Sequence, residues 1–336
     1  MHAFYASIPA RAEGCAQCSP LDDFQVVAAA GADAISFLHG QLTQDVAALP
    51  QDAARLAGYC TAKGRLLATL LMWRAAPGPD DAPVLYALAR ADLAPALLKR
   101  LSMFVLRAKV KLAAAPLHAA GVQAAPGQLA ALETAAGGAL PRSPWQRADL
   151  PTGTWIAAPA AGERLRWWWI ASGEQLDAAH ALPGALGLDS AESWRAGDLA
   201  AGIPWIGAAT QDVFIPQTVN LELIQGVSFT KGCYPGQEVV ARSHYRGTIK
   251  RRMAYGLVES APETPAAALA GQDVYDAAQP GEPVGRVVDA ARAGAGLSLL
   301  FEIALSALHA DLRLGAADGP RLSRRDLPYA IEPEAR

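Results

Sequence analysis

Charged residues are scarce in this sequence, and the two signs nearly cancel. Only 18% of the 336 residues are charged, and 29 basic against 32 acidic side chains leave a formal net charge of −3. A chain with this balance is not drawn as a whole toward nucleic acid or an anionic membrane surface. We therefore expect neither direct DNA binding nor membrane binding.

Cysteines and long apolar runs are scarce as well. Four cysteines in a chain of this length do not form a disulfide framework. The strongest apolar runs, at residues 66–73 and 167–170, are too short to span a bilayer. The first 20 residues lack the basic and apolar regions of a signal peptide. These absences favour a cytoplasmic protein.

Hydrophobic residues, in contrast, are abundant. They make up 52% of the chain, which is enough for large buried cores. We therefore expect a folded protein and not a disordered one. The length favours two or three domains, and we expect a monomer.

The stretch at residues 229–242, FTKGCYPGQEVVAR, brings a thiol, an amine, an amide and a carboxylate together in one short segment. Three residues prevent a continuous helix or strand there, namely Gly232, Pro235 and Gly236. The ammonium of Lys231, two residues before Cys233, favours the thiolate form of that cysteine. Because an acidic residue suits a first helical turn, Glu238 predicts a short helix that begins just after the turn. From spacing alone, a surface turn with an incidental cysteine is an equally good interpretation.

Lys231 to Glu238, KGCYPGQE, resembles the K-G-C-Y-[TN]-G-Q-E signature of the YgfZ family. Those folate-binding proteins are linked to iron–sulfur cluster assembly and repair, and they are similar in fold to the glycine-cleavage aminomethyltransferases. Further similar segments follow in chain order, at residues 31–45 (GADAISFLHGQLTQD), 214–221 (FIPQTVNL) and 327–329 (LPY). The one departure within the signature is Pro235, which lacks the N–H of the family's Thr or Asn.

The resemblance implies an α+β protein of three domains in a ring, with two related α+β domains and a C-terminal β-barrel. The implied domains are a flexible lead at 1–20, a folate-binding domain at 21–115 with 189–248, a second α+β domain at 116–188 and the barrel at 249–336. The folate-binding domain carries the KGCYPGQE turn.

Local patterns predict similar elements. Residues 21–112 show a β-α-β-β-β-α-β order that ends in a strand at 106–112, where apolar and basic residues alternate. A weaker repeat follows at 118–188, and from about residue 253 short apolar segments divided by Gly and Pro predict a small barrel or sandwich. Within the repeat, Trp169 is a candidate stacking platform for a flat heterocycle, with core packing as the alternative.

The resemblance also implies a cofactor, tetrahydrofolate or a one-carbon derivative. Trp194 matches a folate-contacting tryptophan of the family. Phe24 stands where the family has a second tryptophan, so it keeps a stacking face but lacks an N–H donor. We expect further cofactor contacts from the turn and the helix after it, namely Tyr234, Gly236, Gln237 and Arg242.

The implied reactive group is Cys233, which would transiently hold an iron–sulfur cluster or a sulfur atom, or carry a redox step. Lys231 would favour the thiolate, and Glu238 would order the turn or relay protons. The partners would be iron–sulfur enzymes, and tRNA modification would be affected indirectly through one of them. Cys60, in a Cys-x-x-Lys-Gly turn, is a candidate second thiol, with a small buried hydrophobe as the alternative.

Other interpretations stay open, including whether the protein catalyses a reaction. A folate-dependent aminomethyl transferase would need a carboxylate where this chain has Ala68 and Thr69, which argues against it. A non-catalytic module for RNA or protein would use the basic cluster at 245–252, which is also a candidate clamp for a polyglutamate tail. Cys15 and Cys18 form a lone C-x-x-C without a second ligand pair, so no resident metal site is expected.

Overall fold

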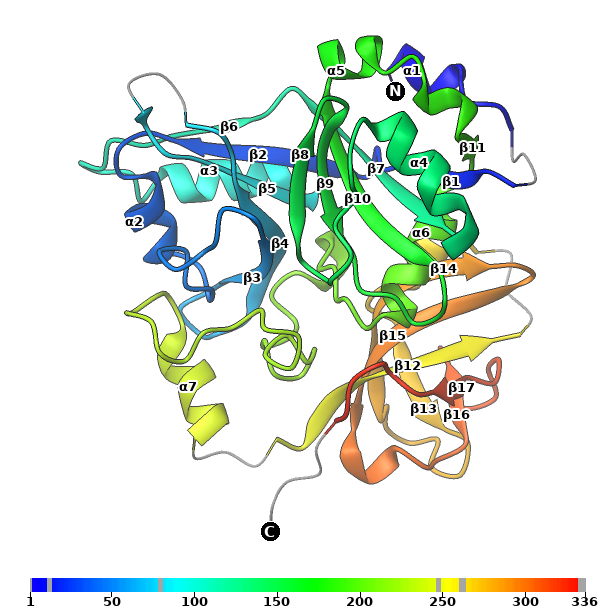
Figure 1. The fold of residues 1–336 in the computed structure, drawn as a ribbon. Coiled ribbons are helices and arrows are strands. Elements are labelled where there is room, and N and C mark those ends of the chain that lie inside the picture. The colour runs from blue at the N-terminus through cyan, green and yellow to red at the C-terminus, as the bar shows by residue number, and fades with distance from the viewer. Residues whose placement is uncertain (1, 11–13, 78–80, 246–248, 260–263, 332–336) are drawn as a thin grey trace. The chain divides into compact units, whose positions relative to one another are not determined.

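The computed structural model of the protein describes residues 2–10, 14–77, 81–245, 249–259 and 264–331 (Figure 1). The chain divides into two compact units. The first comprises Met1–Leu38, Val46–Arg55 and Leu71–Trp194, and the second comprises His39–Asp45, Leu56–Leu70 and Arg195–Arg336. Within the described segments, no helix has the length and apolar character needed to cross a membrane. The division into three domains stays a prediction.

The β-α-β-β-β-α-β order predicted for residues 21–112 is confirmed. The elements are β2 (Phe24–Ala30), α2 (Ala34–His39), β3 (Ala54–Cys60), β4 (Leu66–Arg74), β5 (Val84–Arg90), α3 (Ala94–Ser102) and β6 (Lys111–Ala114). They form a sheet of order β3-β4-β5-β2-β6. In α3, Leu97 and Leu101 are buried on one face, and Pro95 occupies the first turn, where its missing N–H costs no helical hydrogen bond.

The last strand of this sheet is shorter than predicted. Instead of residues 106–112, β6 covers only Lys111–Ala114, and Leu106 is 87% exposed. The neighbouring β2 ends at Ala30, which pairs with Lys111. An alternating pattern becomes a strand only where a neighbouring strand offers hydrogen bonds, and β2 offers none beyond that pair.

Residues 16–20 are not part of a flexible lead, which corrects the expectation for residues 1–20. They form β1 (Ala16–Pro20), which pairs parallel with β11 (Leu186–Leu188) and antiparallel with β7 (Leu117–Ala124). Cys18 is fully buried in this strand. Both partner strands lie about 100 or more residues further along the chain. The local sequence pattern therefore does not predict β1.

β1 belongs to a second sheet of order β11-β1-β7-β10-β9-β8. Its remaining elements and flanking helices are α1 (Ala3–Ala6), α4 (Leu129–Ala136), β8 (Arg147–Leu150), β9 (Gly153–Ala157), β10 (Leu165–Ser172) and α5 (Gly173–Ala178). The strands and helices predicted between 118 and 181 are therefore present, and β8 is an addition.

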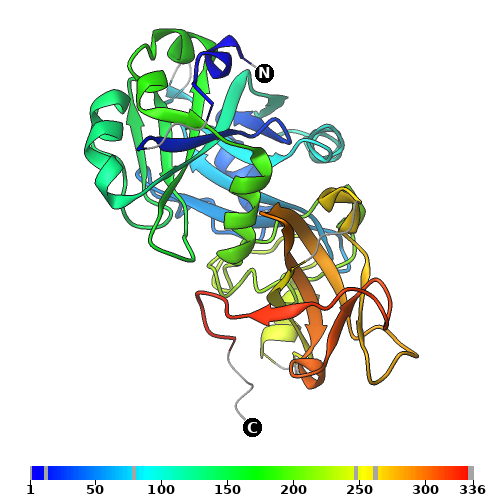
Figure 2. The ribbon, with the colours of Figure 1, turned by 90° about the vertical axis from the view of Figure 1, so that its right-hand side faces the viewer.

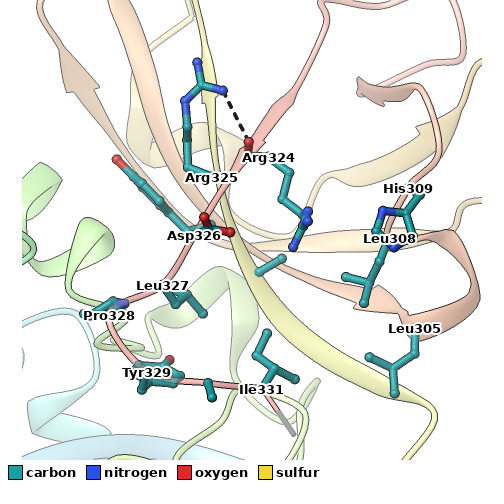
Figure 3. A pocket seen from close by; sticks show the side chains of 13 residues that line it. Leu305, Leu308, His309, Arg324, Arg325, Asp326, Leu327, Pro328, Tyr329 and Ile331 are labelled. Atoms are coloured by element: carbon teal, nitrogen blue, oxygen red, sulfur yellow. Dashed lines mark hydrogen bonds between the residues drawn. The ribbon is translucent and has the colours of Figure 1, made fainter. Parts of the chain in front are cut away.

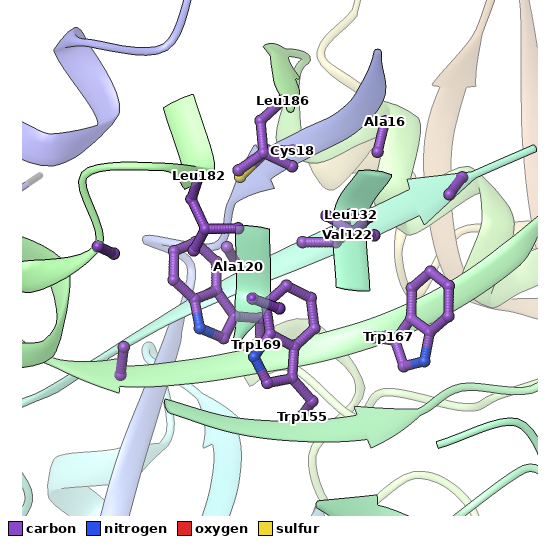
Figure 4. Packing of buried hydrophobic residues seen from close by; sticks show 14 of the residues in the cluster. Ala16, Cys18, Ala120, Val122, Leu132, Trp155, Trp167, Trp169, Leu182 and Leu186 are labelled. Atoms are coloured by element: carbon purple, nitrogen blue, oxygen red, sulfur yellow. The ribbon is translucent and has the colours of Figure 1, made fainter. Parts of the chain in front are cut away.

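Two tryptophans of β10, Trp167 and Trp169, lie in a hydrophobic core cluster (Figure 4). Trp169 is 1% exposed and stacks on Trp155 with ring centroids 5.2 Å apart and an interplanar angle of 14°. Its Nε1 donates to the carbonyl oxygen of Thr152 at 2.8 Å. Trp167 is buried in the same cluster. This placement agrees with the core-packing alternative, because the Trp169 ring has no open face for a ligand.

The C-terminal part of the second unit is a six-stranded antiparallel sheet that curls into a half-barrel (Figure 2). Its order is β16-β13-β14-β15-β12-β17. The strands are β12 (Arg251–Val258), β13 (Asp273–Asp276), β14 (Gly285–Ala293), β15 (Gly296–Ala304), β16 (Leu312–Leu314) and β17 (Ser323–Arg325). Phe301 and aliphatic side chains fill its core.

Two further helices precede this sheet, α6 (Ala191–Ala200) and α7 (Gln237–Tyr245). Short 3₁₀ turns complete the described elements, at Pro126–Gln128, Leu182–Gly184, Ala208–Thr210, Ala266–Leu269 and Leu305–Ala307. Helix α6 stops before Gly202, which has φ +71°.

Candidate functional site

Two glycines fix the turn that carries Cys233. Gly236 has φ +80°, and Gly64, in the turn between β3 and β4, has φ +73°. A Cβ atom at Gly236 would lie 2.3 Å from the carbonyl oxygen of Thr61 and 2.7 Å from the nitrogen of Gly64. The main chains of the two turns are therefore in direct contact, at a left-handed conformation and a distance that only glycine permits.

Cys233 lies four residues before the start of α7, as predicted. The N–H of Val240 donates to the carbonyl oxygen of Gly236 at 3.3 Å, so the turn leads directly into the helix. Glu238 is exposed in the first helical turn, and Cys233 is exposed ahead of it. Arg242 is exposed on the same helix. The thiol is thus accessible to a reaction partner.

Lys231 is buried, although it neighbours the exposed thiol in sequence. It is 8% exposed, and its ammonium donates to the main-chain carbonyl oxygens of His39 and Leu42, the latter at 2.7 Å. Nζ also lies 5.0 Å from the centroid of the Tyr234 ring. Burial lowers the pKa of Lys231 to about 8, while the carboxylate charge of Asp45 acts in the opposite direction. Lys231 therefore ties the turn to the chain that follows α2.

Cys60 and Tyr234 are buried together. Cys60 is 2% exposed at the end of β3, and burial raises the pKa of its thiol to about 12. Burial, and after it the charge of the nearby Cys60, raises the pKa of the Tyr234 hydroxyl. A protonated, buried Cys60 behaves as a small hydrophobe, and its pairing with Cys233 stays a prediction.

The segment at residues 214–221 (FIPQTVNL) holds α7 and β12 in place through buried hydrogen bonds. Gln217 is fully buried, and its Nε2 donates to the carbonyl oxygen of Val240 in α7 at 2.6 Å. Asn220, with φ +57°, donates from Nδ2 to the carbonyl oxygen of Met253 at 2.8 Å, and its Oδ1 accepts from the Met253 N–H at 3.3 Å. Arg252 donates to the Gln217 carbonyl oxygen at 2.9 Å. These residues are anchors of the site.

The basic cluster at 245–252 is described only in part, since residues 246–248 lie outside the described segments. Two of its cations already pair within the chain, Arg251 with Glu302 at 2.7 Å and Arg252 with Glu222. A clamp for a polyglutamate tail would therefore have to compete with these internal carboxylates.

In the first unit, Phe24 borders a cavity of about 370 Å³ that Asp22, Gln25 and His118 also line. The ring is 8% exposed, and the guanidinium of Arg90 lies 5.2 Å from its centroid. An aromatic side chain next to several polar groups fits a flat heterocycle with a hydrogen-bonding edge. The Phe24 side of the predicted folate site is thus compatible with such a ligand.

Trp194, also in the first unit, is enclosed. A Cβ at Gly121 would lie 2.0 Å from its Cδ2 atom, and the guanidinium of Arg166 lies 4.0 Å from its ring centroid. Trp168 meets it edge-on. The buried Nε1 has no acceptor among the described residues. The indole N–H of the fully buried Trp194 thus has an unmet hydrogen-bonding capacity within the described residues, and the ring offers no open stacking face.

Ala68 and Thr69, where a transferase carboxylate was expected to be missing, lie inside β4. Ala68 and Thr69 are each 1% exposed, and Thr69 Oγ1 accepts a hydrogen bond from the N–H of Ile206 at 3.0 Å. Both side chains therefore serve packing and main-chain hydrogen bonding.

Cysteines outside the turn do not gather into a metal site. In the described segments, no group of three or more His, Cys, Asp or Glu side chains could hold a metal ion. Burial raises the pKa of Cys18 to about 12, and the partly exposed Cys15 lies 3.9 Å from the carbonyl oxygen of Gly184.

Two curated proteins match almost the whole chain. The tRNA-modifying protein YgfZ of Yersinia pseudotuberculosis is 32% identical over 319 residues, which cover 93% of this chain and 92% of the relative. The chain belongs to the YgfZ family. A second member, the tRNA-modifying protein YgfZ of Serratia proteamaculans, is 33% identical over 324 residues, covering 94% and 92%. No model of a protein family matches the chain.

A solved structure supports the fold class. The glycine cleavage system aminomethyltransferase T from Bartonella henselae matches 97% of this chain and 88% of its own, with a TM-score of 0.66 and 18% identity. The aminomethyltransferase-like α+β fold predicted for this chain is thereby confirmed.

Within the YgfZ signature, the structure separates anchoring residues from the exposed thiol. Lys231, Tyr234 and Gly236 are buried or packed against main chain, whereas Cys233 is exposed. Sequence reasoning missed the packing partner of Gly236, which is Gly64. The Lys-Gly pair in a short turn between two strands was the available signal for it.

Proposed function

We propose that this protein binds tetrahydrofolate, or a one-carbon derivative of it, and supports the assembly or repair of iron–sulfur clusters in client enzymes. In this proposal it acts as a cytoplasmic monomer. It influences tRNA modification indirectly, because a cluster-containing enzyme carries that reaction out. The observation that carries the proposal is the exposed Cys233 on a turn whose neighbouring side chains are buried and fixed.

The placement of Cys233 supports a thiol that meets a partner. A thiolate is the form that binds cluster iron or attacks sulfur, and Cys233 is the cysteine classed as exposed in the described segments. Lys231 and Gly236 hold the turn in place, so the thiol is presented with little conformational freedom. Glu238, exposed in the first turn of α7, is placed to order the turn or relay a proton.

Two observations support folate. Phe24 lies at the edge of a cavity with Asp22, Gln25 and His118, which could hold a flat ring and its polar edge. The buried Nε1 of Trp194 lacks an acceptor among the described residues, and a ligand carbonyl could supply one. When bound, folate would supply one-carbon or redox chemistry, and these residues would orient it.

One-carbon transfer by this chain is less well supported. Ala68 and Thr69 cannot offset the positive charge of an aminomethyl intermediate, and Thr69 is already engaged by the Ile206 N–H. RNA binding through the basic cluster has little support, because Arg251 and Arg252 pair with carboxylates of the same chain.

The test uses cells that lack this protein and measures a cluster-dependent tRNA modification. The wild type should restore the modification, Cys233→Ala should fail to restore it, and Cys15→Ala should act like the wild type. Equal amounts of folded protein in each strain are verified by immunoblot. Full restoration by Cys233→Ala would remove the thiol from the mechanism and favour a binding-only role.

A further inference from the structure

A cavity of about 690 Å³ lies where the chain leaves β17 (Figure 3). Sites for small molecules typically measure about 300–1,000 Å³. One side of the cavity is aliphatic, formed by Ala254, Leu305, Leu308, Leu327 and Ile331. None of the residues assigned above to folate or to the thiol lines it, so the cavity is independent of the proposed function.

The wall formed by residues 327–331 is fixed by Tyr329. Its hydroxyl donates to the carbonyl oxygen of Gly202 at 3.0 Å and lies 3.5 Å from Nδ2 of Asn220. A Cβ at Gly202 would lie 2.6 Å from the same ring. Tyr329 is therefore locked, and the cavity beside it has a defined shape.

The polar groups of the cavity are mainly basic. Arg324 and His309 reach toward the same region from two sides (Figure 3). The Arg324 guanidinium has no ion pair or hydrogen bond among the described residues, whereas Arg325 points away and donates to the Arg324 carbonyl oxygen at 3.3 Å. Asp326 is the one acidic residue of the lining.

We infer that this cavity binds an amphipathic monoanion, a carboxylate with an aliphatic body of the fatty-acid type. The aliphatic side gains from burying a hydrocarbon chain, and Arg324 supplies two parallel donors suited to a carboxylate. The like charge of Arg324 would repel a cationic amphiphile, and a neutral amphiphile would form no ion pair with that exposed guanidinium. Charge complementarity therefore selects the anion.

The first experiment titrates the full-length protein with three ten-carbon probes by isothermal calorimetry. Decanoate should bind saturably at one site, decanol about tenfold more weakly because its neutral hydroxyl cannot form a bidentate ion pair with Arg324, and decyltrimethylammonium not measurably. Decanoate binding should weaken as salt is added. Equal affinity for decanoate and decanol would overturn the assignment of an anion, and no binding of decanoate would overturn the site.

Variants then locate the binding. Arg324→Gln should weaken decanoate about tenfold, and Leu308→Arg should abolish its binding by filling the aliphatic side. Arg321→Gln is the matched control, because Arg321 is 74% exposed and does not line this cavity. If Leu308→Arg fails to fold, the affinities of Arg324→Gln and Arg321→Gln for decanoate still test the proposal. Equal affinities of these two variants would contradict it.

Discussion

Gly64 occupies the space that a side chain at position 236 would need. A Cβ on Gly236 would come within 2.7 Å of both the nitrogen and the Cα of Gly64. The turn after β3 and the turn before α7 are thereby locked together, and Cys233 is held at the surface of the locked pair.

Gly236→Ala should therefore lower the free energy of unfolding by about 2–4 kcal/mol, through a left-handed alanine and overlap with main-chain atoms. The matched control is Gly294→Ala, since Gly294 also has a left-handed φ of +63°, but a Cβ there would meet no atom within 4 Å. Its loss should be about 1 kcal/mol. Urea denaturation measures both, and equal losses would mean that the contact between the turns contributes nothing.

Lys231 should give the protein a pH dependence of stability above pH 8. Its pKa is about 8 in the folded protein, against 10.5 for an unperturbed lysine, because burial disfavours the ammonium. Between these values the unfolded chain keeps a proton that the folded chain has released, so this residue makes stability rise with pH in that window. The full effect is about 3 kcal/mol.

The measurement compares the wild type with Lys231→Met by chemical denaturation at pH 7, 9 and 10.5. The stability of the wild type relative to the variant should increase across this series. Lys63→Met, which changes an exposed lysine of the neighbouring turn, should keep the wild-type dependence. A constant difference between wild type and Lys231→Met would show that the lysine does not titrate early.

The four cysteines should react with alkylating agents at very different rates. Cys233 is exposed, Cys15 is partly exposed, and Cys18 and Cys60 are buried with pKa values raised to about 12. Because only an accessible thiolate reacts, native protein should show fast labelling at Cys233 and none at Cys18 or Cys60 until it unfolds. Peptide mapping by mass spectrometry identifies each site. Fast labelling of Cys60 would contradict its burial.

Local patterns predicted most of the elements but not their long-range partners. The order of elements from Phe24 to Ala114 follows from alternation, apolar periodicity and glycine or proline breaks, all readable over a few residues. β1 was missed because its partners lie in β7 and β11. The strand at 106–112 was overextended because alternation does not reveal where a neighbouring strand ends.

The candidate site was predictable in its place and less so in the roles of its residues. Glycines, the proline and Glu238 correctly predicted a turn followed by a helix. That Lys231 favours the Cys233 thiolate stays a prediction, whereas the carbonyl oxygens of His39 and Leu42 that hold its ammonium, about 190 positions away in the chain, were not foreseen. The folate contact of Trp194 stays a prediction, and the enclosure of its ring by Gly121 and Arg166 was not foreseen. Such contacts exist only after folding.

Phe24 is a proposed folate contact, and its aromatic ring lies at the edge of a cavity. Phe24→Leu keeps an apolar side chain and removes the flat ring, so the affinity for tetrahydrofolate should fall about three- to tenfold. Phe37→Leu is the control, because Phe37 is buried to a similar degree but does not line this cavity. Both are measured by fluorescence titration, and identical affinities of the two variants would remove Phe24 from the site.

Folate binding and the Cys233 thiol should be separate parts of this protein. We would therefore measure the binding of tetrahydrofolate to purified wild type and Cys233→Ala by equilibrium dialysis under reducing conditions. Both proteins should bind it saturably and with equal affinity. Absence of binding to the wild type would exclude the folate site, and loss of binding in a folded Cys233→Ala variant would show that the thiol belongs to that site.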